Sequence, residues 1–550
     1  PLLLGLMAAP TATADTEADA VPAQEVGSHA AESRADLGSL ARGGMFNLVG
    51  AAASGVLTFG LVLVLTNALG PATYGAFASA LGLFTILSRT SELGADTGLV
   101  RTVARLTARG RPQDIRPTLL IALVPVLTVA TLLGIAMWLW APQLAQIFGK
   151  GRGSDQIADF ARIFAFFLPP SAATLVALSG TRGFGTMVPS VLVDKIGRPA
   201  VQPLLALVVV AGGMGTTAIA LAFAVPLAVA FVAALGWLLL LLRRAEHQAA
   251  RQGTDDAPRP TRELATKFWR FTAPRGFAGI FQVTTLWLNT LLLGGLGSTR
   301  EAGIFNAATR YITAGLMVGV AIQQVLQPTL AELLALGDKR RAREVYQAST
   351  AWLITAVWPL YLSFALFSPA LLRVFGGEFA AGESVLVILG LTMLVATGVG
   401  TVDVVLLMGG KSSWNLYNTI AGLTVQIVLN LLLIPPFGVT GAAVAWAASI
   451  LTNNLAPLTQ VWKFMGLHPF GRGFKRIAPI ALVCYGGVGL ALRLVFGASI
   501  PALIAFEIVG GLLYLAALIR FRHELELPVL WSELRRRRGD RRARPSPAAD

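Results

Sequence analysis

The sequence is poor in charge, cysteine and histidine, and each shortage excludes a class of protein. Only 13% of the 550 residues are Asp, Glu, Lys or Arg, and 55% are apolar, whereas a soluble chain is roughly 25% charged. So little charge cannot cover the surface of a soluble protein of this length, which excludes a soluble enzyme. A disordered protein is excluded as well, because it would have low hydrophobicity. The single cysteine, Cys484, excludes a disulfide framework. Because the four histidines never stand at metal-ligand spacing, we expect neither a metal nor a cofactor.

Long apolar runs dominate the sequence instead. A bilayer-spanning helix needs about 20 mainly apolar residues, and fourteen runs meet this requirement. Gly and Pro between several runs, as in LGPATYG and PPFGVTG, predict tight helical hairpins. We therefore expect an all-α integral membrane protein with fourteen transmembrane helices. The predicted spans are residues 46–68, 74–95, 117–139, 158–180, 186–212, 216–242, 271–296, 303–329, 348–368, 382–408, 414–435, 439–462, 477–497 and 500–519.

The basic residues lie in short clusters between these runs and define an orientation. With both termini in the cytoplasm, 33 of the 44 Lys and Arg residues fall in cytoplasmic segments, 6 on the opposite side and 5 within spans. Positive charge accumulates on the cytoplasmic side of membrane proteins, so we predict a multi-pass protein of the cell membrane with both termini cytoplasmic. The basic C-terminal tail follows the last span directly, which indicates a ligand for anionic lipid rather than for nucleic acid.

The long charged connector of residues 243–270 divides the spans into two groups, and similar sequences occur near the start of each group. The stretches LGPATYGAFASALGLF (69–84) and LGSTREAGIFNAATRY (296–311) both read Leu-Gly, a polar turn, then Gly-x-Phe-x-x-Ala. Internal repeats of this kind imply two pseudo-symmetric six-helix bundles around a midplane cavity. The predicted divisions are a disordered tail (1–40), an N-terminal bundle (41–242), a cytoplasmic linker (243–270), a C-terminal bundle (271–464), two further helices (465–520) and a basic tail (521–550).

Three stretches in order carry a family resemblance. They are residues 63–105, residues 291–315 and residues 407–449, the last with a short basic loop, an Asn-ended apolar helix, Ile-Pro and then Gly-x-x-Gly-Ala-Ala. Over roughly residues 40–520 the chain resembles the polysaccharide (Wzx-type) flippases of the multidrug/oligosaccharidyl-lipid/polysaccharide exporter superfamily. That family often carries an acid in the seventh helix, where this chain has Asn289.

The resemblance implies alternating-access transport of a polyprenyl-diphosphate-linked oligosaccharide from the inner to the outer leaflet. The implied partners are this lipid-linked glycan, membrane lipids, and a polysaccharide polymerase or glycosyltransferases. A lipid II flippase and an ion-coupled multidrug antiporter of the same superfamily remain alternatives. A membrane glycan polymerase or ligase is disfavoured, because the longest predicted outer loop, residues 140–157, is short for a catalytic loop.

Ionisable residues inside spans point to the substrate site, because they are costly without a partner or water. Arg310 is the eighth residue of its span, and its counter-charge must come from the substrate or from an acid on another helix, such as Asp403. Arginine forks to phosphate oxygens and stays charged when buried. Arg275 lies near a helix end and can instead extend to the membrane surface. The predicted substrate-binding residues are Arg275, Arg310, Gln282, Asn289, Gln324 and Arg89.

Arg275, Gln282 and Asn289 follow one another at steps of seven, which places them on one helical stripe. Arg89, Glu92 and Asp96 stand three and four residues apart, so they can pair along one helical face.

Other charged residues in apolar runs leave two interpretations open. Asp194, Lys195 and Arg198 can neutralise one another or line the inner mouth of the cavity. Asp403 and Glu507 are candidates for ion coupling, or neutral acids hydrogen-bonded to a neighbouring helix. Ser or Cys nucleophile arrangements with a nearby His do not occur, so the sequence predicts a transporter and not an enzyme.

Overall fold

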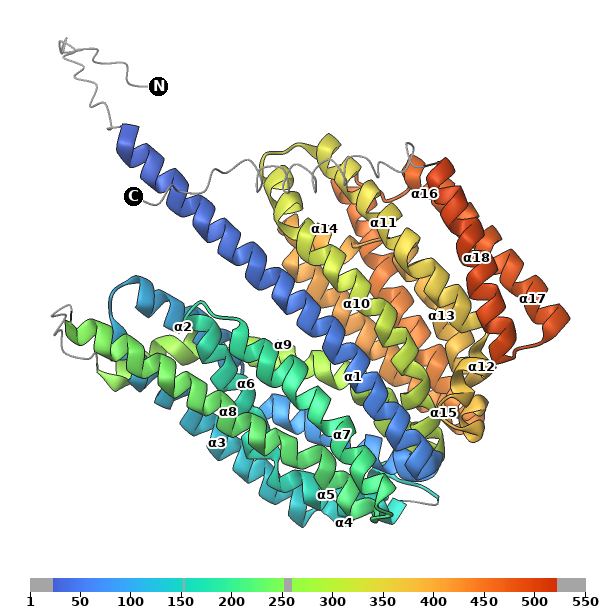
Figure 1. Ribbon diagram of the computed structural model, residues 1–550, viewed down its shortest axis with the longest axis horizontal. Coiled ribbons are helices and arrows are strands. Elements are labelled where there is room, and N and C mark those ends of the chain that lie inside the picture. Colours follow the sequence, from blue (N-terminus) through green and yellow to red (C-terminus); the bar gives the residue numbers. More distant parts are fainter. Residues whose placement is uncertain (1–22, 152–153, 252–259, 522–550) are drawn as a thin grey trace, which may run out of the picture.

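Every regular element in the described part of the chain is a helix (Figure 1). The computed structural model describes residues 23–151, 154–251 and 260–521. The long helix α1 (Ala23–Ser91) crosses the molecule between the other helices of the first half and those of the second half, and it packs against both (Figure 1). The prediction of an all-α protein is therefore confirmed.

The first half continues from α1 through a bundle of shorter helices. These are α2 (Ala95–Ala108), η1 (Pro112–Asp114), α3 (Ile115–Leu139), α4 (Ala141–Phe148), α5 (Ser154–Phe166), α6 (Leu168–Gly183), the π-helical segment η2 (Ser190–Gly197), α7 (Arg198–Ala211) and α8 (Thr216–Arg251). An aromatic core holds them together. The ring of Phe77 lies 5.5 Å from each of Phe160, Phe164 and Phe223, edge-on in all three contacts, an arrangement that aromatic quadrupoles favour.

The second half begins after the connector and ends with a separate group of helices. Its elements are α9 (Thr261–Leu296), α10 (Thr299–Ala335), α11 (Lys339–Leu366), α12 (Ser368–Arg373), η3 (Gly377–Gly382), α13 (Glu383–Gly398), α14 (Val402–Met408), α15 (Ser412–Gln460), η4 (Val461–Met465), α16 (Arg472–Ala481), η5 (Leu482–Gly487), α17 (Val488–Phe496) and α18 (Ile500–Arg520). The last helices pack mainly against α11 and lie at the outer edge of the molecule (Figure 1). They do not enter the space between the two halves.

The chain has the helices of a multi-pass membrane protein. Ten helical stretches among the described residues are long and apolar enough to cross a membrane, or eleven if α5 and α6, bent by 47°, form one span. Two of the ten, Val49–Ala108 with 60 residues and Ser412–Met465 with 54, exceed one crossing, since at about 1.5 Å per residue each is more than twice as long as the bilayer core. They break at Gly70 (φ 66°) and Gly438 (φ 51°), in a left-handed conformation that favours glycine. The number of fourteen crossings remains a prediction.

The two copies of the internal repeat meet each other. A Cβ atom added to Gly75 would lie 1.7 Å from the carbonyl oxygen of Thr299, and one added to Gly303 would lie 2.1 Å from that of Pro71. Gly75 and Gly303 occupy the same position in the repeat, and Pro71 and Thr299 each precede them by four residues. The contact between α1 and α10 is therefore reciprocal, and small residues let the two backbones approach closely.

The boundaries of two predicted segments differ from the structure. α1 begins at Ala23, so the predicted disordered tail 1–40 is helical from residue 23 onwards. The composition explains this, because Ala, Glu and Leu, which recur between residues 23 and 40, are good helix formers. Two helices likewise extend into the predicted linker 243–270. α8 continues as far as Arg251, and α9 begins at Thr261. Residues 1–22, the middle of the linker and most of the basic tail lie outside the described residues.

Candidate functional site

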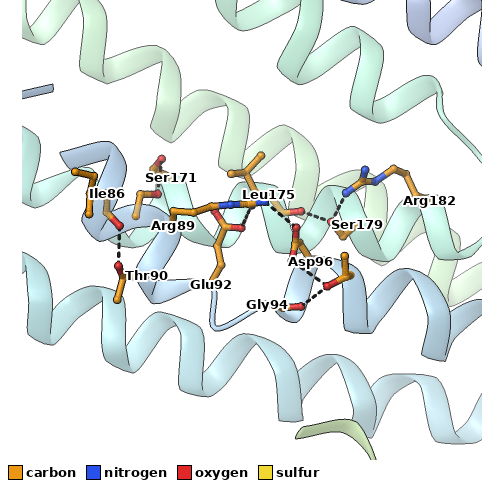
Figure 2. Close-up of polar contacts among 12 residues, drawn as sticks. Ile86, Arg89, Thr90, Glu92, Gly94, Asp96, Ser171, Leu175, Ser179 and Arg182 are labelled. Atoms are coloured by element: carbon orange, nitrogen blue, oxygen red, sulfur yellow. Dashed lines mark hydrogen bonds and ion pairs between the residues drawn. The ribbon is translucent and has the colours of Figure 1, made fainter. Parts of the chain in front are cut away.

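Three charged residues meet where α1 ends and α2 begins. Arg89 pairs through Nη1 with Oε2 of Glu92, and its Nη2 lies 3.3 Å from Oδ2 of Asp96. Figure 2 shows Arg89 extended between the two carboxylates. The turn between the helices brings both acids to one side, because Leu93 (φ 50°) and Gly94 (φ 78°) are left-handed. The pairing that the spacing predicts is thus present, and we call these three residues the Arg89 cluster.

The Arg89 cluster borders a cavity inside the first bundle. The cavity has a volume of about 180 Å³, and hydroxyl groups from two helices face it, with Ser88 Oγ 3.2 Å from Ser171 Oγ. Asp194 and Arg198, which pair at 2.9 Å, line it from the side of η2 and α7. The full lining is Leu81, Phe84, Thr85, Ser88, Arg89, Glu92, Ser171, Thr174, Leu175, Asp194, Arg198, Phe223, Leu227, Ala230 and Val283.

Close to this cavity, two buried polar atoms have no hydrogen-bond partner among the residues that the structure describes. One is Oε1 of Glu92, whose side chain is 1% exposed. The other is Nε of Arg182 on α6, whose Nη2 donates to Ser179 Oγ (Figure 2). Buried polar groups are almost always paired, so each of these two atoms is a position where a water or a bound group can supply the missing partner. Lys195 of η2 bonds instead to α1, where its Nζ donates to Asn47 Oδ1 at 2.7 Å.

Arg310 lies in a second polar site, at the contact between the two halves. Its Nη2 donates to Asn306 Oδ1 at 2.8 Å, and the Tyr74 hydroxyl on α1 donates to the same oxygen at 2.9 Å. The guanidinium also lies 5.8 Å from the ring centre of Trp287 on α9. Nε of Arg310 is buried without a partner, and Arg310 forms no ion pair within the described ranges. Asp403, considered above as its counter-charge, therefore does not fill that role.

The predicted stripe on α9 does not form one surface in the structure. Asn289 is buried against α15, where its Oδ1 accepts from Gln426 Nε2 at 3.2 Å and from Asn430 Nδ2 at 2.7 Å. Gln282 is exposed, and Arg275 is exposed with its guanidinium 4.3 Å from the ring centre of Phe271. The structure therefore places the three residues in three different surroundings.

The remaining predicted site residues lie apart from both polar sites. Gln324 is exposed on α10. Asp403 is half-buried in the first turn of α14, and Glu507 is exposed on α18. Neither acid lines the cavity of the first bundle.

Several residues of these sites were not identified from the sequence. Ser171, Thr174 and Arg182 come from α6, far along the chain from Arg89. Tyr74 and Asn306 lie inside the two repeat stretches, and that location is the one signal that could have singled them out.

Comparisons with known proteins agree with this architecture. The family model described as "Polysaccharide biosynthesis protein" matches residues 40–334. Two curated proteins of Haloferax volcanii are similar in part. The probable low-salt glycan biosynthesis flippase Agl15 is 23% identical over 189 residues, which cover 33% of this chain and 39% of the relative. The probable flippase AglR is 24% identical over 238 residues, which cover 41% and 49%. The chain thus matches less than half the length of either relative.

Solved structures share the fold over most of the chain. The lipid II flippase MurJ in an inward closed conformation superposes with a TM-score of 0.67 at 12% identity, covering 87% of this chain and 99% of MurJ. An inward-facing multidrug resistance transporter of the MATE family gives 0.58 at 15% identity, covering 78% and 95%. At such identities the likeness establishes the fold alone. Because the family model covers more than half of the sequence, the chain belongs to the family of polysaccharide biosynthesis proteins.

Proposed function

We propose that the protein is a flippase that moves a polyprenyl-diphosphate-linked oligosaccharide from the inner to the outer leaflet of the cell membrane. The family match, the two archaeal relatives named as flippases and the shared fold with a lipid II flippase support this proposal. In this scheme both termini are cytoplasmic and the halves rock around their contact. A polymerase or glycosyltransferases would act on the same glycan.

The unpaired cation at Arg310 carries the proposal. A guanidinium inside a membrane span is costly unless an anion or water compensates it, and no acid of the described chain does so. A diphosphate fits this position, since arginine binds phosphate oxygens with two parallel hydrogen bonds. The partners already present, Asn306 and Tyr74, hold the guanidinium but leave its charge uncompensated.

The same site discriminates between the alternatives. A lipid II flippase would use the same chemistry, because its substrate also carries a polyprenyl diphosphate. A multidrug antiporter exporting cationic compounds would gain nothing from a central cation. A glycan polymerase or ligase would need catalytic groups at an outer surface, where the connection between α3 and α5 is built mainly by the short helix α4.

Transport by reconstituted protein tests the role of Arg310. Vesicles would contain a radiolabelled polyprenyl-diphosphate-linked oligosaccharide, and its arrival in the outer leaflet would be measured with a hydrolase added outside. We expect Arg310→Ala to reduce transport roughly 10- to 100-fold, because a charge-assisted hydrogen bond contributes about 1.5–3 kcal/mol. Arg310→Lys should restore only part of the rate, since lysine lacks the fork geometry.

The matched control is Arg493→Ala. Arg493 on α17 is an arginine of a predicted span that already has an acidic partner, Glu383 at 2.7 Å, and lies far from α1 in the chain. This variant should transport at the wild-type rate. Thermal unfolding of each variant in detergent separates loss of transport from loss of folded protein. Wild-type transport by folded Arg310→Ala would refute the proposal.

A further inference from the structure

Glu92 is a buried acid with one carboxylate oxygen in an ion pair and the other without a partner among the described residues. Its Oε2 pairs with Arg89, whereas Oε1 is buried and has no partner in the described chain. The side chain is 1% exposed and borders the 180 Å³ cavity. Burial in a low-dielectric interior penalises the charged form of a carboxylate, and a cavity of this size with hydroxyl groups in its wall can hold several waters. Waters in this cavity would lie beside the Glu92 side chain, which forms part of the cavity wall, and could bring a proton to it.

Charged groups from several elements surround Glu92. In the Arg89 cluster one guanidinium faces two carboxylates, so the cluster carries a formal net charge of −1. Across the cavity Asp194 and Arg198 pair with each other and contribute no net charge. Arg182 from α6 bonds to the neutral Ser179 and keeps a positive charge, which offsets the net charge of the Arg89 cluster, so that a proton on Glu92 changes this balance by one unit. Lys195 bonds to the neutral Asn47 on α1. The cavity residues of α8 and α9, namely Phe223, Leu227, Ala230 and Val283, are apolar.

The Arg89 cluster is in contact with the second half through α9. A Cβ atom at Gly94 would lie 2.6 Å from the nitrogen of Gly276, and one at Gly98 would lie 2.3 Å from Thr272 Oγ1. A Cβ atom at Gly279 would lie 3.5 Å from Nε of Arg89 itself. The backbones of α2 and α9 are thus in close contact at Gly94 and Gly276, so a movement of the start of α2 would displace this part of α9.

We propose that Glu92 is a proton-binding site that controls the packing of α2 against α9. When Oε1 accepts a proton, Glu92 becomes neutral and its attraction for Arg89 falls. Arg89 then pairs mainly with Asp96 on α2, which lies two residues from Gly94. The start of α2 and the segment of α9 around Gly276 shift together, and the inner ends of the two halves change their separation. The inference goes beyond the proposed transport reaction, because it does not depend on which substrate is carried.

Distance measurements between the halves test this proposal without any substrate. Spin labels would be attached at Ala104 of α2 and at Leu336 after α10, both exposed, in a Cys484→Ser background. The distance distribution of the purified protein in nanodiscs would be recorded by pulsed electron spin resonance over a series of pH values. We expect a wild-type distribution that shifts with pH through one midpoint. Glu92→Gln, which mimics the protonated acid, should keep the low-pH distribution throughout.

The matched control is Glu383→Gln, an acid that also pairs with an arginine but lies far from the cavity. It should retain the wild-type midpoint. Glu92→Asp keeps a titrating group in a changed position and should move the pH midpoint. This variant tests the proposal if Glu92→Gln does not fold. A wild-type distribution independent of pH would overturn the proposal. So would an unchanged pH response in Glu92→Gln, or an unchanged midpoint in Glu92→Asp. None of these outcomes bears on Arg310, so the two proposals fail separately.

Discussion

The reciprocal glycine contact between α1 and α10 predicts a large loss of stability when one methyl group is added at Gly75. In Gly75→Ala the new Cβ atom would lie 1.7 Å from the Thr299 carbonyl oxygen and 2.8 Å from the Gly303 nitrogen. Carbon and oxygen come no closer than about 3.3 Å in favourable contacts, so α1 and α10 must separate locally by about 1.5 Å. Overpacking costs typically about 1–3 kcal/mol. We expect the upper end, about 3 kcal/mol, because the obstructing atoms are backbone and cannot rotate away.

Thermal unfolding in detergent micelles measures this effect. Gly75→Ala should lower Tm by several degrees, and Gly303→Ala should do the same, since its Cβ would lie 2.1 Å from the Pro71 carbonyl oxygen. The control is Gly60→Ala in the same helix, where a Cβ atom meets nothing within 4 Å. Alanine is the better helix former by about 1 kcal/mol, so this variant should be unchanged or more stable. Equal stability of the Gly75 and Gly60 variants would refute the reasoning.

Two further predictions concern the amide cluster and the orientation. Asn430→Leu removes the 2.7 Å hydrogen bond to the buried Asn289 and should lower Tm, with a cost of about 0.6–2 kcal/mol, whereas Thr424→Leu at an exposed position of α15 should not. A cysteine introduced at the exposed Gln248, in the Cys484→Ser background, should react with an impermeant maleimide in inside-out vesicles and not in intact cells. Labelling from outside would reverse the orientation derived from the loop charges.

The sequence predicts well what depends on local composition. The length of the apolar runs is sufficient to predict an all-helical membrane protein. The repeat predicts two related halves, and only the structure shows that its two copies meet at Gly75 and Gly303. Arg310 could be singled out because the cost of a charge in a span does not depend on the details of packing. The pairing of Arg89 with Glu92 and Asp96 follows from spacing, since the three residues are close in the chain.

The sequence does not predict an environment that comes from distant segments. Steps of seven keep residues on one side of a helix, but α9 contacts α2 near Gly276 and α15 near Asn289, so one stripe faces different neighbours along its length. The sequence places Asn289 among the substrate-binding residues, and the structure surrounds it with two amides of α15. The cavity beside Glu92 could not be predicted either, because α6, α7 and α8 close it from positions far along the chain.

The position of α9 gives the two polar sites a common element. Gly276 and Gly279 contact the Arg89 cluster and the start of α2, whereas Trp287 and Thr290 contact Arg310 and Asn306. Eleven residues separate Gly279 from Thr290, which is about 16 Å along a helix. If a displacement of α9 joins the sites, their coupling must be reciprocal. Whatever factor a proton at Glu92 applies to the affinity for a diphosphate at Arg310, the diphosphate applies the same factor to the affinity for the proton. A tenfold factor would move the pH midpoint of Glu92 by one unit, so proton binding and substrate binding are two measurements of a single free energy.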